Sequence, residues 1–297
     1  MKKMFGVISA MVTPFTKDDQ VDVKTLQAYT DYLIKNGVHC LYPCGTTGEM
    51  LKMSVAERKI VAETVIKQAA GRVQVYIHVG AMTTKETIEL ARHAHSAGAD
   101  GIGVVTPQFF SVNDREMEEF YVAVANSVPA DFSVYMYNIP QCAANDLRPT
   151  IIEKILKRTK NIVGVKYSFP DFLRVKDYLL INNGNFSVVV GTDRLFLAGL
   201  AMGCDGTVSG CSNAGPKKFV EVYEKFKAGD LAGARKAQVL ATELCEIIKS
   251  GADMAIFKYA LERHGLPAAH MRAPALDMTA ADKNDLSAKL DAFEKKS

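Results

Sequence analysis

The chain has 297 residues, of which 48% are hydrophobic and 23% charged, so it can bury a large core. Its formal net charge is only +3, and no basic run is longer than a pair such as Lys295-Lys296, which gives no sign of a nucleic-acid or membrane-surface partner. No apolar stretch approaches the roughly 20 residues that span a bilayer, and the first apolar run is too short for a secretory leader. These features predict a cytoplasmic protein.

Short apolar runs rich in β-branched residues alternate with longer amphipathic segments. The predicted strands are residues 6–12, 40–43, 73–79, 101–106, 132–137, 162–166, 187–190 and 206–209. The predicted helices between them include residues 23–36, 54–70, 84–97, 115–127 and 149–157. Two of these helices begin with the pattern of a capping box, at Ser54-x-x-Glu57 and Thr83-x-x-Glu86. Eight such alternations predict parallel strands joined by crossover helices.

A short pattern recurs before three of the predicted strands, at residues 36–40, 97–101 and 202–206. Each copy reads as a glycine helix cap, a two-residue turn and a strand. The eight units favour a (β/α)8 TIM barrel over an open doubly wound sheet. After residue 209 only helical patterns follow, at 217–228, 231–249, 254–264 and 280–294. We therefore expect an α/β fold with the barrel and active site in residues 1–229, and a three-helix C-terminal region in 230–297.

The cysteines and histidines show no spacing typical of a metal site. The six cysteines include no Cys-x-x-Cys pair, and His93 and His95 would point to different faces of a helix. Cys40 and Cys44 are expected to be small buried thiols on one face of a strand. We therefore predict no bound metal.

Lys166 ends an apolar strand, a place where a lysine is costly to accommodate. Desolvation disfavours the charged form of such an amine, and a neutral amine is a nucleophile toward ketones. The alternative is a structural lysine that reaches water or pairs with a carboxylate. In a (β/α)8 barrel, the carboxyl end of each strand faces the active site, which favours the first interpretation.

Other polar residues follow neighbouring strands at the same end of the barrel. The second strand leads into the segment 45–49, Gly-Thr-Thr-Gly-Glu, whose amides could hold a carboxylate or could form an ordinary turn. Tyr137 ends the fifth strand, and the segment 191–194, Gly-Thr-Asp-Arg, follows the seventh. Four segments with complementary chemistry would therefore meet at one face.

Together these segments resemble the dihydrodipicolinate synthase/N-acetylneuraminate lyase superfamily of class I aldolases. The matching segments are Thr13-Pro14-Phe15, Gly45-Thr46-Thr47-Gly48-Glu49, Val105-Thr106-Pro107, Tyr137-Asn138-Ile139-Pro140 and Gly164-Val165-Lys166. The resemblance covers nearly the whole chain. It implies a (β/α)8 barrel with three extra helices, usually a homotetramer, and chemistry that needs no cofactor.

The resemblance also implies roles for these residues. Lys166 would form a Schiff base with pyruvate or another 2-oxo acid, and Tyr137 would shuttle protons with help from the Thr46 hydroxyl. The amides of Thr46 and Thr47, after Gly45, would hold the substrate carboxylate. The other expected substrate-binding residues are Gly191, Asp193, Arg194, Cys142, Phe110 and Ser209. An aldehyde would be the second substrate.

Three positions depart from the family pattern. Cys142 stands where the synthases have an arginine that holds the second substrate's carboxylate, which argues against dihydrodipicolinate synthesis. Arg194 stands where sialic acid lyases have a glutamate. At the third position the family has a tyrosine that reaches the neighbouring subunit's site, and the two nearby candidates here are Phe109 and Phe110.

We therefore predict a pyruvate-type aldolase or lyase that acts on an acidic or oxidised carbon chain, whose tail Arg194 would contact. Arg194 could equally be a surface residue. Two other reactions stay open: 4-hydroxy-tetrahydrodipicolinate synthesis and dehydration of a 3-deoxy-2-oxo sugar acid. A non-catalytic barrel that senses an oxo acid is the remaining alternative.

Overall fold

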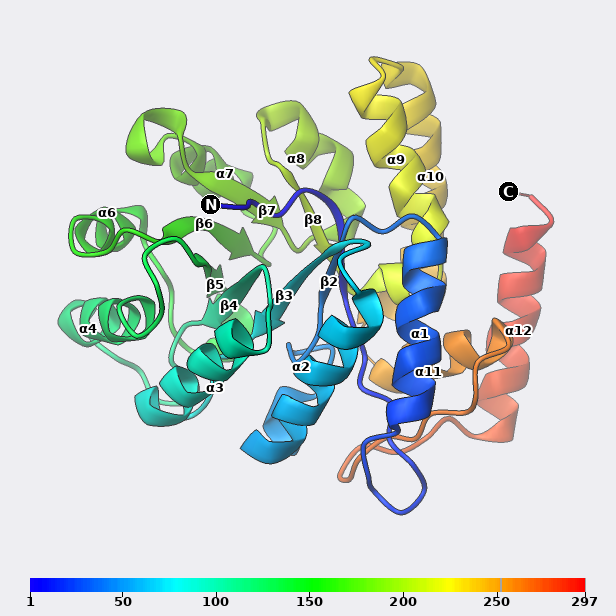
Figure 1. Ribbon diagram of the computed structural model, residues 1–297. Coiled ribbons are helices and arrows are strands. Elements are labelled where there is room, and N and C mark those ends of the chain that lie inside the picture. Colours follow the sequence, from blue (N-terminus) through cyan, green and yellow to red (C-terminus); the bar gives the residue numbers. More distant parts are fainter. Residues whose placement is uncertain (252, 297) are drawn as a thin grey trace.

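Eight parallel strands close into a barrel in the order β1 to β8, with β8 paired back onto β1 (Figure 1). The computed structural model describes residues 1–251 and 253–296, so residues 252 and 297 of the predicted C-terminal region lie outside the described part. The strands are β1 (Gly6–Ala10), β2 (Cys40–Tyr42), β3 (Gln74–His78), β4 (Gly101–Val105), β5 (Ser133–Asn138), β6 (Ile162–Tyr167), β7 (Ser187–Val190) and β8 (Gly206–Ser209). The predicted (β/α)8 barrel is confirmed.

Helices connect the strands and cover the outside of the barrel (Figure 1). They are α1 (Val23–Lys35), α2 (Val55–Ala69), α3 (Thr84–Ser96), α4 (Asp114–Ala125), α5 (Pro140–Ala143), α6 (Pro149–Leu156), α7 (Phe172–Leu179), α8 (Phe196–Met202) and α9 (Pro216–Lys227). The capping box at Ser54 and Glu57 forms as predicted. At Thr83 only half of it forms, because the Glu86 carboxylate accepts from the Thr83 hydroxyl instead of the backbone amide.

Three further helices gather on one side of the barrel, next to α1 and α9: α10 (Leu231–Ile247), α11 (Met254–Arg263) and α12 (Ala280–Glu294) (Figure 1). Helix α10 packs along α9, and α11 reaches the short helical segment η4 (Cys211–Asn213) that follows β8. The C-terminal helices therefore contact loops at the carboxyl ends of the strands. None of the described helices is long and apolar enough to cross a membrane.

Large aromatic side chains fill the interior of the barrel. Tyr42, Tyr76 and Tyr135 are fully buried in one cluster with small aliphatic residues from β1, β7 and β8. A Cβ atom at Gly103 would overlap the Tyr42 hydroxyl, so the glycine lets this ring extend across to β4. The interior of the barrel is therefore a packed core.

The expectation that Cys40 and Cys44 share one face of a strand is wrong. Cys40 packs inside the barrel, whereas Cys44 packs in the core between strands and helices. Strand β2 ends at Tyr42, and Cys44 has a positive φ of 62°, so the two-residue alternation of side chains does not continue to it.

Candidate active site

Lys166 and Tyr137 lie next to each other at the carboxyl ends of β6 and β5. The two residues are paired in the strand register, and the Lys166 Nζ lies 3.9 Å from the centroid of the Tyr137 ring. The Lys166 side chain is buried, with 5% of the residue exposed, and its Nζ also faces the Tyr42 ring at 5.0 Å. None of the ion pairs formed by the described residues includes Lys166. The amine therefore sits between two aromatic rings without a carboxylate partner in that part of the chain.

His78 forms the wall of the site beside Tyr137. Its ring is fully buried and perpendicular to the Tyr137 ring, with centroids 6.0 Å apart. Its Nδ1 lies 3.0 Å from the Cys44 carbonyl, which fixes the proton on Nδ1 when the ring is neutral. Burial, and then the positive charges of Arg58 and Lys166, hold the pKa of His78 well below its usual value. The site therefore contains a neutral imidazole whose buried Nε2 has no hydrogen-bond partner among the described residues.

The neutral state of His78 predicts a stability that falls in acid. Its folded pKa is lowered, so the unfolded chain binds the proton more readily, and stability is lost as the pH drops below the unfolded value of about 6.5. Between about pH 7.5 and 5.5, protonation of this residue in the unfolded chain should lower the free energy of unfolding by about 1.4 kcal/mol. Urea unfolding at both pH values should show a smaller loss for His78→Asn than for the wild type. Equal losses would contradict this assignment.

The loop after β2 has two backbone amides that bond to no other backbone group in the described part of the chain. The Glu49 amide donates to the Thr46 carbonyl at 3.0 Å, and the Met50 amide donates to the Gly45 carbonyl at 3.3 Å. None of the backbone hydrogen bonds of the described residues uses the N–H of Thr46 or Thr47. Thr46 is exposed and Thr47 half-buried, so both amides lie where an anion could reach them.

A buried ion pair with helix α11 holds this loop in place. The Glu49 carboxylate is 2.6 Å from the Nζ of Lys258, which is itself only 1% exposed. Lys52 approaches the other carboxylate oxygen at 2.9 Å, and Lys258 also donates to the His270 carbonyl at 2.6 Å. Burial lowers the pKa of Lys258, and the Glu49 charge opposes this effect. Helix α11 therefore supports the loop after β2 directly.

Removing the buried cation should destabilise the protein strongly. Lys258→Met leaves Glu49 buried, with Lys52 as its remaining ion-pair partner among the described residues, and breaking such a pair costs about 3 kcal/mol. We expect a clearly lower urea midpoint for this variant. The matched control is Lys59→Met, since Lys59 pairs with Glu89 at the surface and its loss should cost less than about 1 kcal/mol. Equal midpoints for the two variants would contradict the account.

Two cavities open at this end of the barrel. The first has a volume of about 300 Å³ and is mainly apolar, with Thr46, Val105, Ile139 and Cys142 in its wall. The second, which we call the polar cavity because most residues in its wall are polar, has a volume of about 560 Å³. Its wall includes Gln141, Ser168, Gly191, Thr192, Asp193, Arg194 and Thr242. Glycine is required at position 191, because a Cβ atom there would overlap the Ser168 hydroxyl.

The predicted residues after β7 and β8 differ in their exposure and in whether they line the polar cavity. Arg194 is exposed, lines the polar cavity and belongs to none of the ion pairs of the described residues. Asp193 also lines this cavity, and burial raises its pKa. Ser209 is fully buried and accepts a hydrogen bond from the Ser212 amide at 2.8 Å. Ser209 is not part of the wall of either cavity and supports the loop after β8.

Phe109 and Phe110 lie at the surface. They are 76% and 70% exposed and pack edge to face with centroids 5.0 Å apart. Asn145 fixes their loop by donating to the Phe110 carbonyl at 2.8 Å. Phe110 is in the wall of neither cavity at the mouth.

Three residues of this site are not among the predicted site residues. Tyr42 and His78 could have been found, because the alternation along β2 and β3 turns their side chains inward at the strand ends. Lys258 gave no comparable signal, because it lies on a helix far along the chain from Glu49.

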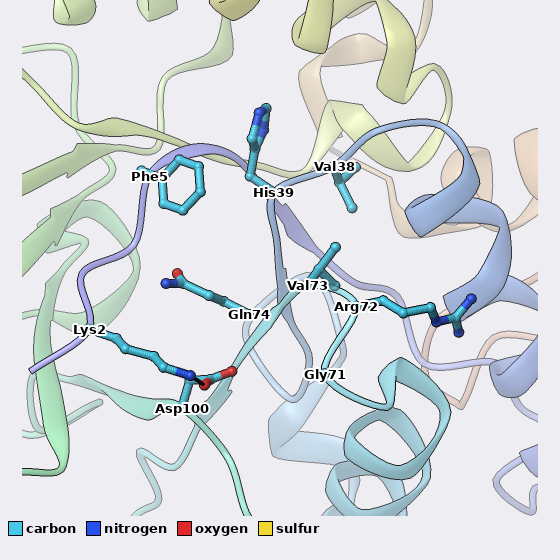
Figure 2. Close-up of a pocket in the computed structure, with 9 residues that line it drawn as sticks. All are labelled: Lys2, Phe5, Val38, His39, Gly71, Arg72, Val73, Gln74 and Asp100. Carbon is cyan, nitrogen blue, oxygen red and sulfur yellow. Dashed lines mark hydrogen bonds and ion pairs between the residues drawn. The ribbon is translucent and has the colours of Figure 1, made fainter.

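A further pocket lies at the opposite end of the barrel (Figure 2). It has a volume of about 390 Å³, and most of its wall precedes a strand, as His39, Val73 and Asp100 do. Figure 2 shows the ion pair of Lys2 with Asp100, at 2.5 Å, across one side of this pocket. Catalytic residues of (β/α)8 barrels lie at the carboxyl ends of the strands, so this pocket is not the active site.

Comparisons with known proteins identify the family. The model of the dihydrodipicolinate synthetase family matches residues 3–293. A 4-hydroxy-tetrahydrodipicolinate synthase from Sorangium cellulosum is 35% identical over 95% of this chain and 93% of its own length. The probable 2-dehydro-3-deoxy-D-pentonate aldolase YjhH of Escherichia coli is 32% identical over 90% of this chain and 89% of its own length.

Solved structures agree with these relatives. The crystal structure of YagE, a prophage protein of the dihydrodipicolinic acid synthase family from Escherichia coli in complex with pyruvate, superposes with a TM-score of 0.92. The match covers 98% of this chain and 99% of YagE at 29% identity. The chain therefore belongs to the dihydrodipicolinate synthetase family and is an enzyme of the aldolase and lyase type.

Proposed function

We propose that this enzyme cleaves a 2-oxo acid to pyruvate and an aldehyde through a Schiff base on Lys166. The observation that carries the proposal is the position of this amine, which is buried and lies 3.9 Å from the Tyr137 ring without an ion-pair partner among the described residues. A structural lysine would be expected to reach water or a carboxylate. The pyruvate complex of the related YagE is consistent with this substrate.

The proposed reaction needs only groups of this chain. Lys166 adds to the keto carbon, water leaves, and the resulting protonated imine accepts the electrons of the carbon–carbon bond that breaks. Tyr137 takes the proton from the hydroxyl that becomes the aldehyde, and Thr46 assists it. Protonation of the enamine and hydrolysis of the imine then release pyruvate and the amine. The amides of Thr46 and Thr47 hold the substrate carboxylate during these steps.

The polar cavity favours a substrate tail with hydroxyl groups and an acid. Its wall offers the side chains of Gln141, Ser168, Thr192 and Arg194 for hydrogen bonds. The apolar cavity has Cys142 where family synthases have an arginine, so it offers a carboxylate no bidentate partner at that position. A 2-oxo-3-deoxy sugar acid therefore fits better than the substrates of 4-hydroxy-tetrahydrodipicolinate synthase. The relative named 2-dehydro-3-deoxy-D-pentonate aldolase supports this choice.

The best test is a panel of 2-oxo acids, with pyruvate release as the readout. We expect cleavage of 3-deoxy sugar acids and little condensation of pyruvate with an aldehyde that carries a carboxylate. Formation of a 2,5-dioxo acid without pyruvate would indicate dehydration instead. Pyruvate binding without any turnover would favour a sensor and would overturn the proposed reaction.

Arg194 provides a test of the tail site. Arg194→Ala should raise KM about 10- to 100-fold for a substrate with an acidic tail, since a hydrogen bond to a charged group contributes about 1.5–3 kcal/mol. The kcat value should change much less. A 2-oxo acid with an uncharged tail is the control, and its KM should stay near the wild-type value. If KM for the acidic substrate is also unchanged, the guanidinium does not contact the tail.

We also propose that the enzyme is a homotetramer, as is usual for the family that the sequence resembles. Exposed apolar residues support this proposal, namely Phe109 and Phe110 near the site and Leu173 and Leu180 around helix α7. Two separate apolar surfaces are what a tetramer with two kinds of interface needs. Sedimentation at equilibrium would measure the assembly.

A further inference from the structure

Two cysteines and an aspartate meet beneath the polar cavity. Asp193 follows β7, Cys211 follows β8, and Cys245 lies on α10. Their Oδ and Sγ ligand atoms all lie within 4.8 Å of one another. Among residues 1–251 and 253–296, this is the one group of three such side chains found at this spacing.

The cluster is closed on one side and open on the other. Cys211 is 2% exposed, and Cys245 is fully buried. Asp193 and Cys211 belong to the wall of the 560 Å³ cavity, whereas Cys245 lies behind them and is not part of that wall. Water or a small ligand in the cavity could therefore approach the cluster from one direction.

Neighbouring groups hold the aspartate in position. The Cys211 amide donates to Asp193 Oδ2 at 3.1 Å, and the Thr207 hydroxyl donates to Oδ1 at 3.4 Å. The Gln238 side-chain amide donates to the Asp193 carbonyl at 3.2 Å. Such outer contacts orient ligands in metal sites and limit the reorganisation that binding requires.

We propose that Asp193, Cys211 and Cys245 bind a zinc ion. Thiolate and carboxylate oxygen are both common zinc ligands, and a pair of thiolates selects zinc over magnesium or calcium. Bonds of about 2.0–2.3 Å in a tetrahedron bring ligand atoms to about 3.3–3.8 Å from one another, a small contraction of the observed cluster. Water from the cavity would complete the fourth position. Binding releases both thiol protons to solvent, so the affinity falls as the pH is lowered.

A bound ion would connect three parts of the fold. It would link the segments after β7 and β8 to helix α10 of the C-terminal region. Any ligand that binds only the folded protein raises its stability. Zinc should therefore raise the melting temperature of the wild type in proportion to the logarithm of its concentration above Kd.

The test uses the full chain after treatment with a chelator. Competition with a chromophoric chelator should show one zinc ion bound per chain, and Cys245→Ser should weaken binding at least 100-fold. Two matched controls should bind like the wild type: Cys204→Ser removes another buried thiol, and Cys142→Ser removes an exposed one. Equal zinc affinity in the wild type and Cys245→Ser would overturn the proposal.

Cobalt gives a second readout that needs no variant. Co²⁺ bound to two thiolates gives an intense thiolate-to-cobalt absorption band in the near ultraviolet, and oxygen ligands alone do not. We expect this band in the wild type, with its loss on addition of zinc. A wild-type chain that binds cobalt without the band, or binds neither ion, would contradict the assignment. Both measurements are independent of substrate turnover. A failure of the zinc proposal can therefore be distinguished from a failure of the proposed aldolase reaction.

Discussion

Replacing Lys166 by alanine is expected to lower kcat by a factor of about 10⁴ or more, since removal of a nucleophile disables the whole catalytic unit. The variant should still fold, because it removes a buried amine that has no ion-pair partner among the described residues. Steady-state release of pyruvate from the substrate found in the panel measures the effect.

The matched control for Lys166 lies in the same part of the chain. Lys160 precedes strand β6 and is exposed, so Lys160→Ala should keep the wild-type rate. If Lys166→Ala and Lys160→Ala turned over substrate equally, the Schiff-base account would be wrong. A loss of activity that accompanied a loss of folded structure would be recognised by circular dichroism.

Replacing Tyr137 by phenylalanine should lower kcat by about 10²- to 10⁴-fold, the usual contribution of a positioned acid–base group. The substitution keeps the ring beside the Lys166 Nζ and removes only the hydroxyl. Binding of the substrate should change little, so the effect should appear in kcat and kcat/KM equally.

Tyr135 is the control for this experiment. It lies two residues earlier on the same strand, is fully buried, and donates from its hydroxyl to the Ser187 hydroxyl at 2.7 Å. Tyr135→Phe should therefore lower stability by about 1 kcal/mol and leave kcat near the wild-type value. The assignment of Tyr137 would fail if its variant kept full activity, or if both variants lost it equally.

The barrel could be predicted because its signals are local. Each predicted strand is a short apolar run, and the glycines at 37, 98 and 203 have the positive φ values expected just before a new strand. Lys166 and Tyr137 could be paired in advance because parallel strands bring their carboxyl ends to one face. These inferences needed only the order of the segments.

Contacts between distant segments could not be predicted in this way. Glu49 and Lys258 come from a loop after β2 and from helix α11, and no periodic pattern links them. The same holds for Asp193, Cys211 and Cys245, whose spacing resembles no metal motif. Cys44 was misplaced because one residue with positive φ ends the strand alternation.

Trapping of pyruvate on the enzyme tests the central claim most directly. The wild type is incubated with pyruvate and borohydride, which reduces an imine to a stable amine, and the modified peptide is identified by mass spectrometry. We predict a single pyruvyl adduct on Lys166 and none in Lys166→Ala. Failure to form any adduct, or an adduct on another lysine that persists in Lys166→Ala, would contradict the proposed chemistry.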